Sequence, residues 1–394
     1  MSTEARPADA DRPTLPPAAR PGLPAGEVDT PALLLDLAAF ERNLDRLQAR
    51  ADAAGVQLRP HAKAHKCPDI ARAQIARGAV GVCCQKVSEA LPFVQAGIGD
   101  IHLSNQVASP AKADLLARLA RHARMSVCVD STRQIDLLAA AVRTHGSTLG
   151  VLVEIDIGQG RCGVADAPAV LRLLEHLERA ARQGAGLHFR GLQAYHGAIQ
   201  HLRDAAQRHQ QAALAAARAA RVLTALQHAG VACPVVTGGG TGSVAADLAS
   251  GLYTEVQPGS YVFMDGDYAL NEPGPADQAL RFEHSLYLAS TVMSTAGGTH
   301  VVLDAGLKSL ATDSGLPRVC AVGGGATGHR YLAANDEHGI VQPAPGAATL
   351  AEGEPLWLVP GHCDPTLNLH DQLVGCRDGR VECIWPIAAR GLSR

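Results

Sequence analysis

Aromatic residues and net charge of either sign are both scarce in this sequence. Phe, Trp and Tyr together make up 3% of its 394 residues, and the formal net charge at pH 7 is −3. Such a chain lacks the aromatic platforms that stack nucleic-acid bases and the basic excess that attracts nucleic acid or an anionic membrane. With 47% hydrophobic residues it can bury a sizeable core, so composition indicates a globular enzyme or small-molecule binder.

Long hydrophobic runs and CxxC motifs are also missing. No stretch approaches the roughly 20 consecutive apolar residues of a membrane-spanning helix. Residues 1–26 contain six prolines and no apolar run of signal-peptide length, which predicts a disordered tail or extended arm over 1–27. The ten cysteines include no CxxC pair. Without a secretion signal we expect free thiols and a cytoplasmic location.

Short β-rich runs recur eight times through the middle of the chain. Most gaps between them hold Ala-, Leu- and Arg-rich helix formers, and the longest gap stops at Gly230, a residue typical of helix C-termini. Strands alternating with helices predict an α/β fold, a (β/α)8 TIM-type barrel over 38–275. The runs are 56–63, 79–86, 100–106, 124–131, 150–158, 189–197, 233–240 and 253–260. The last connection, 241–252, has room for two or three helical turns.

Two segments lie outside this rhythm. An apolar run at 28–37 precedes the first barrel strand, and from about residue 280 β runs follow one another without long helices. The second pattern predicts a mostly β C-terminal domain over 276–394.

Polar residues gather at the C-terminal ends of the eight runs. In a barrel these ends share one face, where active sites are built. Any single strand turns polar as it leaves the core, but repetition in nearly every run favours a site. The residues are His61, Lys63, Gln85, Asn105, Asp130, Glu154, Asp156, Tyr195, His196, Thr237 and Gln257.

Two of these ends together suggest pyridoxal 5′-phosphate. The loop Gly238–Thr241 lies at the end of the seventh run. Backbone N–H groups of successive glycines can converge on a phosphate there, although such a loop alone is more often an ordinary turn. Lys63, in "RPHAKAHK" (59–66), could bind the cofactor aldehyde as a Schiff base, with a surface lysine as the alternative. Basic neighbours in 59–66 would surround it with further positive charge. Arg161 could face the pyridine nitrogen or be an ordinary anion-binding or surface arginine.

A second cofactor is indicated by "VPGHCDPTLNLHD". His362 and Asp364 are two positions apart, so in an extended chain they point the same way. One imidazole and one carboxylate can form half of a divalent-metal site, of a kind that suits Mn²⁺ or Mg²⁺ better than structural zinc. The alternative is a loop histidine beside an aspartate that caps a helix.

Taken in order, the motifs of this chain resemble those of the D-threonine aldolase family, over about residues 28–392. That family belongs to the alanine racemase-like, fold-type III pyridoxal phosphate enzymes. The resemblance implies that the 28–37 strand joins the C-terminal domain and that the protein is a homodimer. The motifs are "DTPALLLDL", "RPHAKAHK", "GAVGVCCQKVSEA", "SNQV", "VEIDIGQGRCGV", "GLQAYHG", "VTGGGTGS", "YTEVQPGSYVFMD", "VLDAGLK", "DEHG" and "PGHCDPT".

The resemblance also implies roles for individual residues. Lys63 matches the cofactor lysine and Arg161 the arginine at the pyridine nitrogen. For the hydroxyl base, His196 and a metal-bound water are both candidates. The metal ligands match His362 and Asp364. The remaining cofactor contacts are Gln85, Tyr195, Thr237, Gly238, Gly239, Gly240, Thr241 and Tyr261.

The expected reaction is retro-aldol cleavage of D-3-hydroxy amino acids, such as D-threonine, to glycine and an aldehyde. A 3-hydroxy-D-aspartate aldolase would need an added cation, for which Lys308, His338 and His201 are conceivable. A D-serine dehydratase-like lyase would have cysteine at the position of Asp364. A racemase gives no reason for a metal pair, and non-catalytic cofactor carriers resemble the barrel alone.

Overall fold

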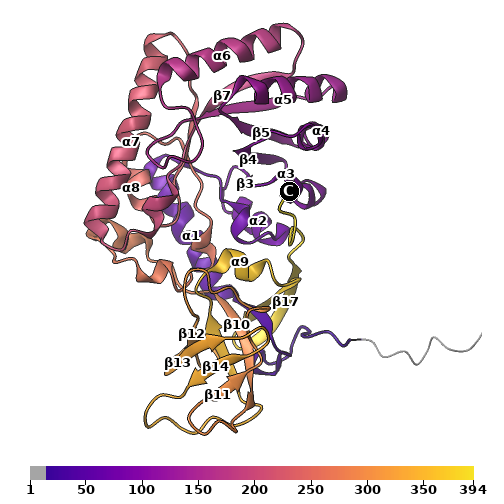
Figure 1. The fold of residues 1–394 in the computed structure, drawn as a ribbon, viewed down its shortest axis with the longest axis vertical. Helices are drawn as coiled ribbons and strands as arrows, with labels where there is room; N and C mark the ends of the chain where they lie inside the picture. Colours follow the sequence, from indigo (N-terminus) through magenta and orange to yellow (C-terminus); the bar gives the residue numbers. More distant parts are fainter. Residues whose placement is uncertain (1–14) are drawn as a thin grey trace, which may run out of the picture.

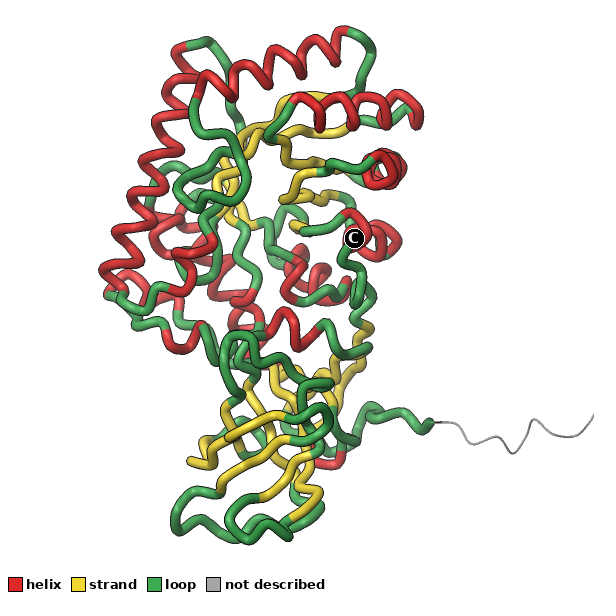
Figure 2. The backbone as a smooth tube through the Cα atoms, in the orientation of Figure 1, coloured by secondary structure: helices red, strands yellow, loops and turns green. Residues whose placement is uncertain are grey.

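The computed structural model describes residues 15–394, and its larger part is a ring of parallel strands inside a layer of helices (Figures 1 and 2). The strand order is β2-β9-β8-β7-β6-β5-β4-β3. Backbone bonds from Val80 N to Leu58 O (2.9 Å) and from Cys83 N to Pro60 O (2.8 Å) join β2 to β3 and close the ring. The predicted barrel is confirmed. Its strands are β2 Gln57–Leu58, β3 Val82–Cys84, β4 Asp100–Gln106, β5 Arg124–Val129, β6 Leu149–Glu154, β7 Leu187–Ala194, β8 Val235–Gly238 and β9 Glu255–Val256.

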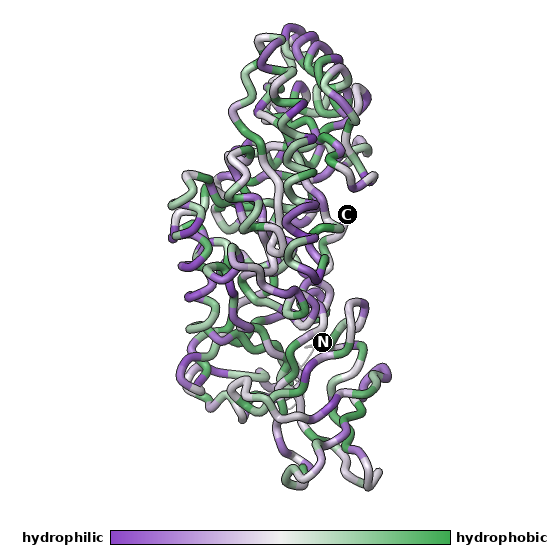
Figure 3. The backbone as a smooth tube through the Cα atoms, turned by 90° about the vertical axis from the view of Figure 1, so that its left-hand side faces the viewer, coloured by the Kyte–Doolittle hydropathy of each residue, from purple (hydrophilic) through white to green (hydrophobic). Residues whose placement is uncertain are grey.

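The barrel helices form where apolar residues recur at helical spacing behind a capping residue. In α6, the Asp166 side chain accepts a hydrogen bond from Ala169 N (2.9 Å), and the buried positions are spaced three or four residues apart. Hydrophilic and hydrophobic residues accordingly alternate along the helices (Figure 3). The helices are α1 Leu37–Ala54, α2 Pro68–Ile75, α3 Val87–Gln95, α4 Pro110–Leu119, α5 Thr132–His145, α6 Ala167–Arg182, α7 Ala205–His228 and α8 Val244–Ala249. With six residues, α8 is shorter than the two or three turns expected, because the loop after β8 occupies 239–243.

The smaller part is a nine-stranded sheet in the order β11-β14-β13-β12-β15-β10-β1-β16-β17. Strand β1 (Ala32–Asp36) precedes the barrel in sequence, yet it pairs antiparallel with β10 and parallel with β16. The sequence pattern does not predict β12, β13, β14 or β16. Most of β13 is exposed, so this strand lacks a buried apolar face. The remaining elements are β10 Leu286–Ser294, β11 Val301–Leu303, β12 Arg318–Cys320, β13 Ala326–Ala334, β14 Gly339–Gln342, β15 Pro355–Val359, α9 Cys363–Leu367, β16 Gln372–Arg377 and β17 Arg380–Pro386.

The N-terminal segment described from residue 15 onward lies along this second sheet (Figure 1). Gly22 N donates to Val381 O, and Val381 N donates to Leu23 O, both at 2.8 Å. These bonds fit an extended arm; the first fourteen residues of the predicted tail lie outside the described residues. In the described part, no helix is long and apolar enough to cross a bilayer, and all ten cysteines are free thiols.

The two parts meet at the C-terminal face of the barrel. Gly266 N donates to Pro360 O (2.8 Å) and Asp267 N to Gly361 O (3.0 Å). The buried Asp265 carboxylate accepts from Cys363 N (3.0 Å), at the start of α9. These bonds hold the loop before α9 over the barrel mouth, so residues from both ends of the chain reach one cavity.

Candidate functional site

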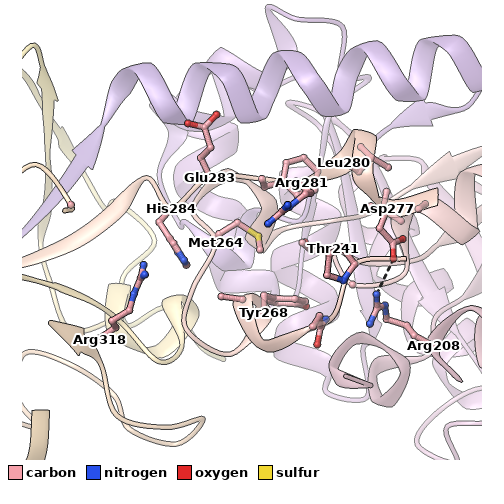
Figure 4. A pocket seen from close by; sticks show the side chains of 18 of the residues that line it. Arg208, Thr241, Met264, Tyr268, Asp277, Leu280, Arg281, Glu283, His284 and Arg318 are labelled. Carbon is pink, nitrogen blue, oxygen red and sulfur yellow. Dashed lines mark hydrogen bonds and ion pairs between the residues drawn. The ribbon is translucent and has the colours of Figure 1, made fainter. Parts of the chain in front are cut away.

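A cavity of about 230 Å³ lies at the barrel mouth, between the ends of the strands and the loop before α9. It is lined by an amine, a guanidinium, imidazoles and a carboxylate, which makes it the candidate reactive site. A larger cavity of about 500 Å³ shares Thr241 and Tyr268 with it but has no lysine (Figure 4). The predicted residues that line the smaller cavity are Lys63, Gln85, Arg161, Tyr195, Gly239, Gly240, Thr241, His362 and Asp364.

Lys63 lies in a short 3-10 turn (Ala62–Ala64) directly after β2. His61 Nδ1 accepts from Lys63 N (3.4 Å), and His61 Nε2 lies 2.9 Å from Ser104 Oγ and 3.1 Å from Gln85 Oε1. Burial and the Lys63 charge hold the pKa of His61 well below its ordinary value, so the ring is neutral and its proton is on Nε2. The Lys63 side chain is 44% exposed, and its Nζ lies 3.9 Å from Asp364 Oδ2. The amine therefore opens into the cavity.

The other basic residues of 59–66 do not charge the cavity as expected. The fully buried Arg59 pairs with Asp100 and Glu255 inside the barrel, each at 2.8 Å. Lys66 pairs with the buried Glu89 at 2.7 Å. Carboxylates therefore neutralise these two cations inside the fold, and of the three only Lys63 lines the cavity.

The glycine loop after β8 is shaped by close backbone contacts. A Cβ on Gly238 would lie 1.9 Å from Ala194 O, and one on Gly240 would lie 2.6 Å from Gln200 Oε1. Gly239 has φ 72°, which favours glycine. Thr241 Oγ1 accepts from Tyr261 N (3.1 Å). Gly239, Gly240 and Thr241 line the same cavity as Lys63, and together they leave a cradle of small residues that fits the phosphate of the predicted cofactor.

Arg161 lies at the cavity wall on the loop after β6. Its guanidinium carbon is 5.5 Å from the centroid of the Tyr195 ring, and its Nη2 is 4.0 Å from Glu154 Oε1. Burial raises the pKa of Glu154, although a bond from Gln106 opposes this. The guanidinium therefore lies over the tyrosine ring and lines the cavity.

His362 and Asp364 reach the cavity from a geometry other than the expected extended chain. His362 occupies the position just before α9 without a side-chain capping bond, and Asp364 lies in the first turn of that helix. His362 Nδ1 lies 2.7 Å from Asp313 Oδ2, which leaves Nε2 free. The buried Asp364 Oδ1 has no hydrogen-bond partner among the described residues. A free imidazole nitrogen and an unpaired carboxylate oxygen fit a divalent cation. Within residues 15–394 no group of three or more His, Cys, Asp or Glu side chains is placed to hold a metal ion. Water or substrate would therefore complete the coordination.

Four predicted residues do not line the cavity. They are His196, Thr237, Gly238 and Tyr261. Thr237 lies in the barrel interior, where its Oγ1 donates to Glu255 Oε1 (2.8 Å). The buried Tyr261 hydroxyl accepts from Gln74 (3.1 Å), so only its backbone reaches the glycine loop. His196 lies against Gly158, and its buried Nδ1 has no partner in the described chain. The geometry gives no support for His196 as the hydroxyl base.

His201 is a candidate for the hydroxyl base that the sequence pattern did not indicate. It lines the cavity, and its Nδ1 lies 2.5 Å from Asp267 Oδ2. A carboxylate at Nδ1 fixes the tautomer and leaves Nε2 as a proton acceptor. No sequence signal distinguishes His201 from His196, because both lie in the loop after β7 and only folding decides which ring enters the cavity.

Comparisons with known proteins agree with this geometry. Residues 35–267 match the family described as alanine racemase, N-terminal domain, and residues 285–376 match a putative serine dehydratase domain. A D-threonine aldolase of Arthrobacter sp is 54% identical over 380 residues, which cover 96% of this chain and 97% of the relative. This chain belongs to the D-threonine aldolase family.

Two further similar proteins agree with this family assignment. A 3-hydroxy-D-aspartate aldolase of Paracoccus denitrificans (strain Pd 1222) is 44% identical, with 95% of each chain covered. The crystal structure of D-threonine aldolase from Filomicrobium marinum superposes with a TM-score of 0.89 at 47% identity, covering 96% of this chain and 100% of that one. The family resemblance seen in the motifs is thereby confirmed, as is its two-part fold.

Proposed function

We propose that this protein cleaves D-3-hydroxy amino acids such as D-threonine to glycine and an aldehyde. Pyridoxal phosphate would be bound by Lys63, and a divalent cation by His362 and Asp364. One observation carries the proposal: the Lys63 amine, the glycine loop and the His362–Asp364 pair all open into a single cavity. Membership of the D-threonine aldolase family supports the same reaction.

The residues proposed for the cofactor have two functions: they bind it, and they set the protonation of its ring nitrogen. Pyridoxal phosphate, when bound, supplies an aldehyde for an amine and a ring that accepts electrons from the bond cleaved at Cα. The chain holds it through Lys63 and the glycine loop. Arg161 can only donate hydrogen bonds, so it keeps a pyridine nitrogen beside it unprotonated. The ring is then a weaker electron sink, and activation of the hydroxyl becomes correspondingly important.

Hydroxyl activation falls to other residues that line the same cavity. His201 Nε2 is the base that takes the proton, and Asp267 at Nδ1 stabilises the imidazolium that results. A cation held by His362 and Asp364 would supply Lewis acidity toward the hydroxyl. The imidazole ligand favours Mn²⁺ over Mg²⁺. Preference for the D-enantiomer is inferred from the family.

The cavity favours an uncharged substituent at Cβ over the carboxylate of 3-hydroxy-D-aspartate. Lys308 pairs with Glu337 at 2.6 Å on the exposed surface, and His338 is also exposed; neither lines the cavity. His201 is engaged by Asp267. Once the residues proposed for cofactor and metal are assigned, the described lining has no further cation for a second carboxylate.

A product assay tests the proposed reaction. D-threonine, D-phenylserine, 3-hydroxy-D-aspartate and D-serine are each incubated with Mn²⁺ and, separately, with EDTA. We expect glycine and an aldehyde from D-threonine and D-phenylserine, with less turnover of 3-hydroxy-D-aspartate. Pyruvate and ammonia from D-serine, with no glycine from the other substrates, would identify a dehydratase instead.

A further inference from the structure

The side-chain amide of Gln200 joins the glycine loop to the turn that carries His201. Gln200 is 2% exposed and lies in the 3-10 turn Gly197–His201, immediately before the proposed base. Its Oε1 accepts from Gly242 N (2.9 Å) and Ser243 N (3.2 Å). Its Nε2 donates to Ser243 Oγ (2.8 Å). One buried amide therefore satisfies three polar groups just after the cofactor cradle.

The loop rests directly on this turn. A Cβ on Gly240 would meet Gln200 Oε1 at 2.6 Å, and a Cβ on Gly242 would meet Gln200 O at 2.2 Å. The same carbonyl accepts from Asn271 Nδ2 (2.9 Å), which ties the turn to the segment beyond Asp267. Ser243 Oγ in turn donates to Asp247 Oδ2 (2.6 Å). The back of the loop is thus fixed, while Gly239, Gly240 and Thr241 face the cavity.

We infer that Gln200 is a positioning residue that holds the glycine loop in the conformation needed by the phosphate of the cofactor. Successive glycines are flexible, so an unsupported loop would have to be ordered at the moment of binding. Gln200 removes that cost by ordering the loop beforehand. The inference rests on the proposed cofactor site. It concerns the phosphate alone, because Gln200 does not line the cavity that holds Lys63 and Arg161.

A comparison of two aldehydes, one with and one without a phosphate, measures how much the phosphate contributes to cofactor affinity. The apoprotein of wild type and of Gln200→Met is titrated with pyridoxal 5′-phosphate and, separately, with pyridoxal, and absorbance gives each Kd. Methionine has a similar volume but makes none of the amide's four hydrogen bonds, which join it to Gly242 N, Ser243 N, Ser243 Oγ and His196 O (3.4 Å). We expect pyridoxal phosphate to bind about tenfold more weakly to the variant and pyridoxal to change by less than about twofold. Gln210→Met, an exposed glutamine on α7, is the control and should leave both values unchanged.

The outcomes separate this inference from the proposed function. Equal weakening of both aldehydes, or no weakening of either, overturns the role of Gln200. Wild type that binds neither aldehyde overturns the cofactor assignment itself. If Gln200→Met does not fold, Ser243→Ala decides, because it keeps both bonds to Gln200 Oε1 and removes the hydroxyl that accepts from Gln200 Nε2 and donates to Asp247 Oδ2. It should weaken pyridoxal phosphate about threefold and leave pyridoxal unchanged; an unchanged ratio of the two Kd values in this variant also overturns the inference.

Discussion

Asp247, behind the glycine loop, makes the stability of this protein depend on pH in an unusual direction. Its buried carboxylate accepts from Ser243 Oγ (2.6 Å) and lies against Gly239. Burial raises the pKa of Asp247 to about 7 from 3.8, although the Ser243 hydroxyl and Gly240 N–H act in the opposite direction. His196 and Tyr253 line the same small void. Burial lowers the pKa of His196, so that ring supplies no positive charge there near neutral pH.

The sign follows from the proton that the folded state retains. Between pH 3.8 and about 7 the folded protein holds a proton on Asp247 that the unfolded chain has lost, so stability falls as pH rises through this range. The pKa difference is about 3.2 (about 7 minus 3.8), and each pKa unit corresponds to about 1.4 kcal/mol. The folded protein is therefore less stable above pH 7 than below pH 3.8 by about 4 kcal/mol from this group. About 2 kcal/mol of this is lost between about pH 5.5 and about pH 8.5.

Asp247→Asn removes the ionisation while retaining an acceptor for Ser243. Urea unfolding of the apoprotein is followed by circular dichroism at several pH values from about 5.5 to about 8.5. The free energy of unfolding of the variant should rise relative to wild type by about 2 kcal/mol across this range. Asp336→Asn, which alters an exposed carboxylate, is the control and should show no such trend. A difference between variant and wild type that stays constant with pH would refute a protonated Asp247.

Four further predictions test the site and the assembly. Borohydride reduction followed by peptide mapping should place the pyridoxyl label on 59–66, and a label elsewhere would contradict the role of Lys63. His362→Ala should lose metal-dependent activity but keep the cofactor absorbance; full activity after exhaustive chelation would exclude the metal role. His201→Asn should lower kcat about 10²–10⁴-fold while His196→Asn changes it only a few fold, and the reverse order would restore His196 as the base. Sedimentation should show the homodimer implied by the family, and a stable, active monomer would contradict it.

The barrel was predictable because its signals are local. Short β-rich runs and the helix formers between them reflect residue preferences within a few positions, and they locate all eight strands. The end of the first run likewise places Lys63 at the barrel mouth, since parallel strands in a closed ring end on one face. The His362–Asp364 pair was found from residue type alone, although its geometry is that of a helix start.

Contacts between distant segments decided the rest. Strand β1 enters the second sheet because β10 and β16 offer it partners some 250 or more residues away in sequence. Asp265 caps α9 across about 100 residues and so brings the proposed metal ligands over the barrel. Sequence determines that Thr237, His196 and His201 are polar residues near strand ends. Only the packed barrel decides that the first is buried below the cavity, the second turned toward Gly158 and the third exposed to the cavity, because the direction of a side chain in a loop depends on what that loop packs against.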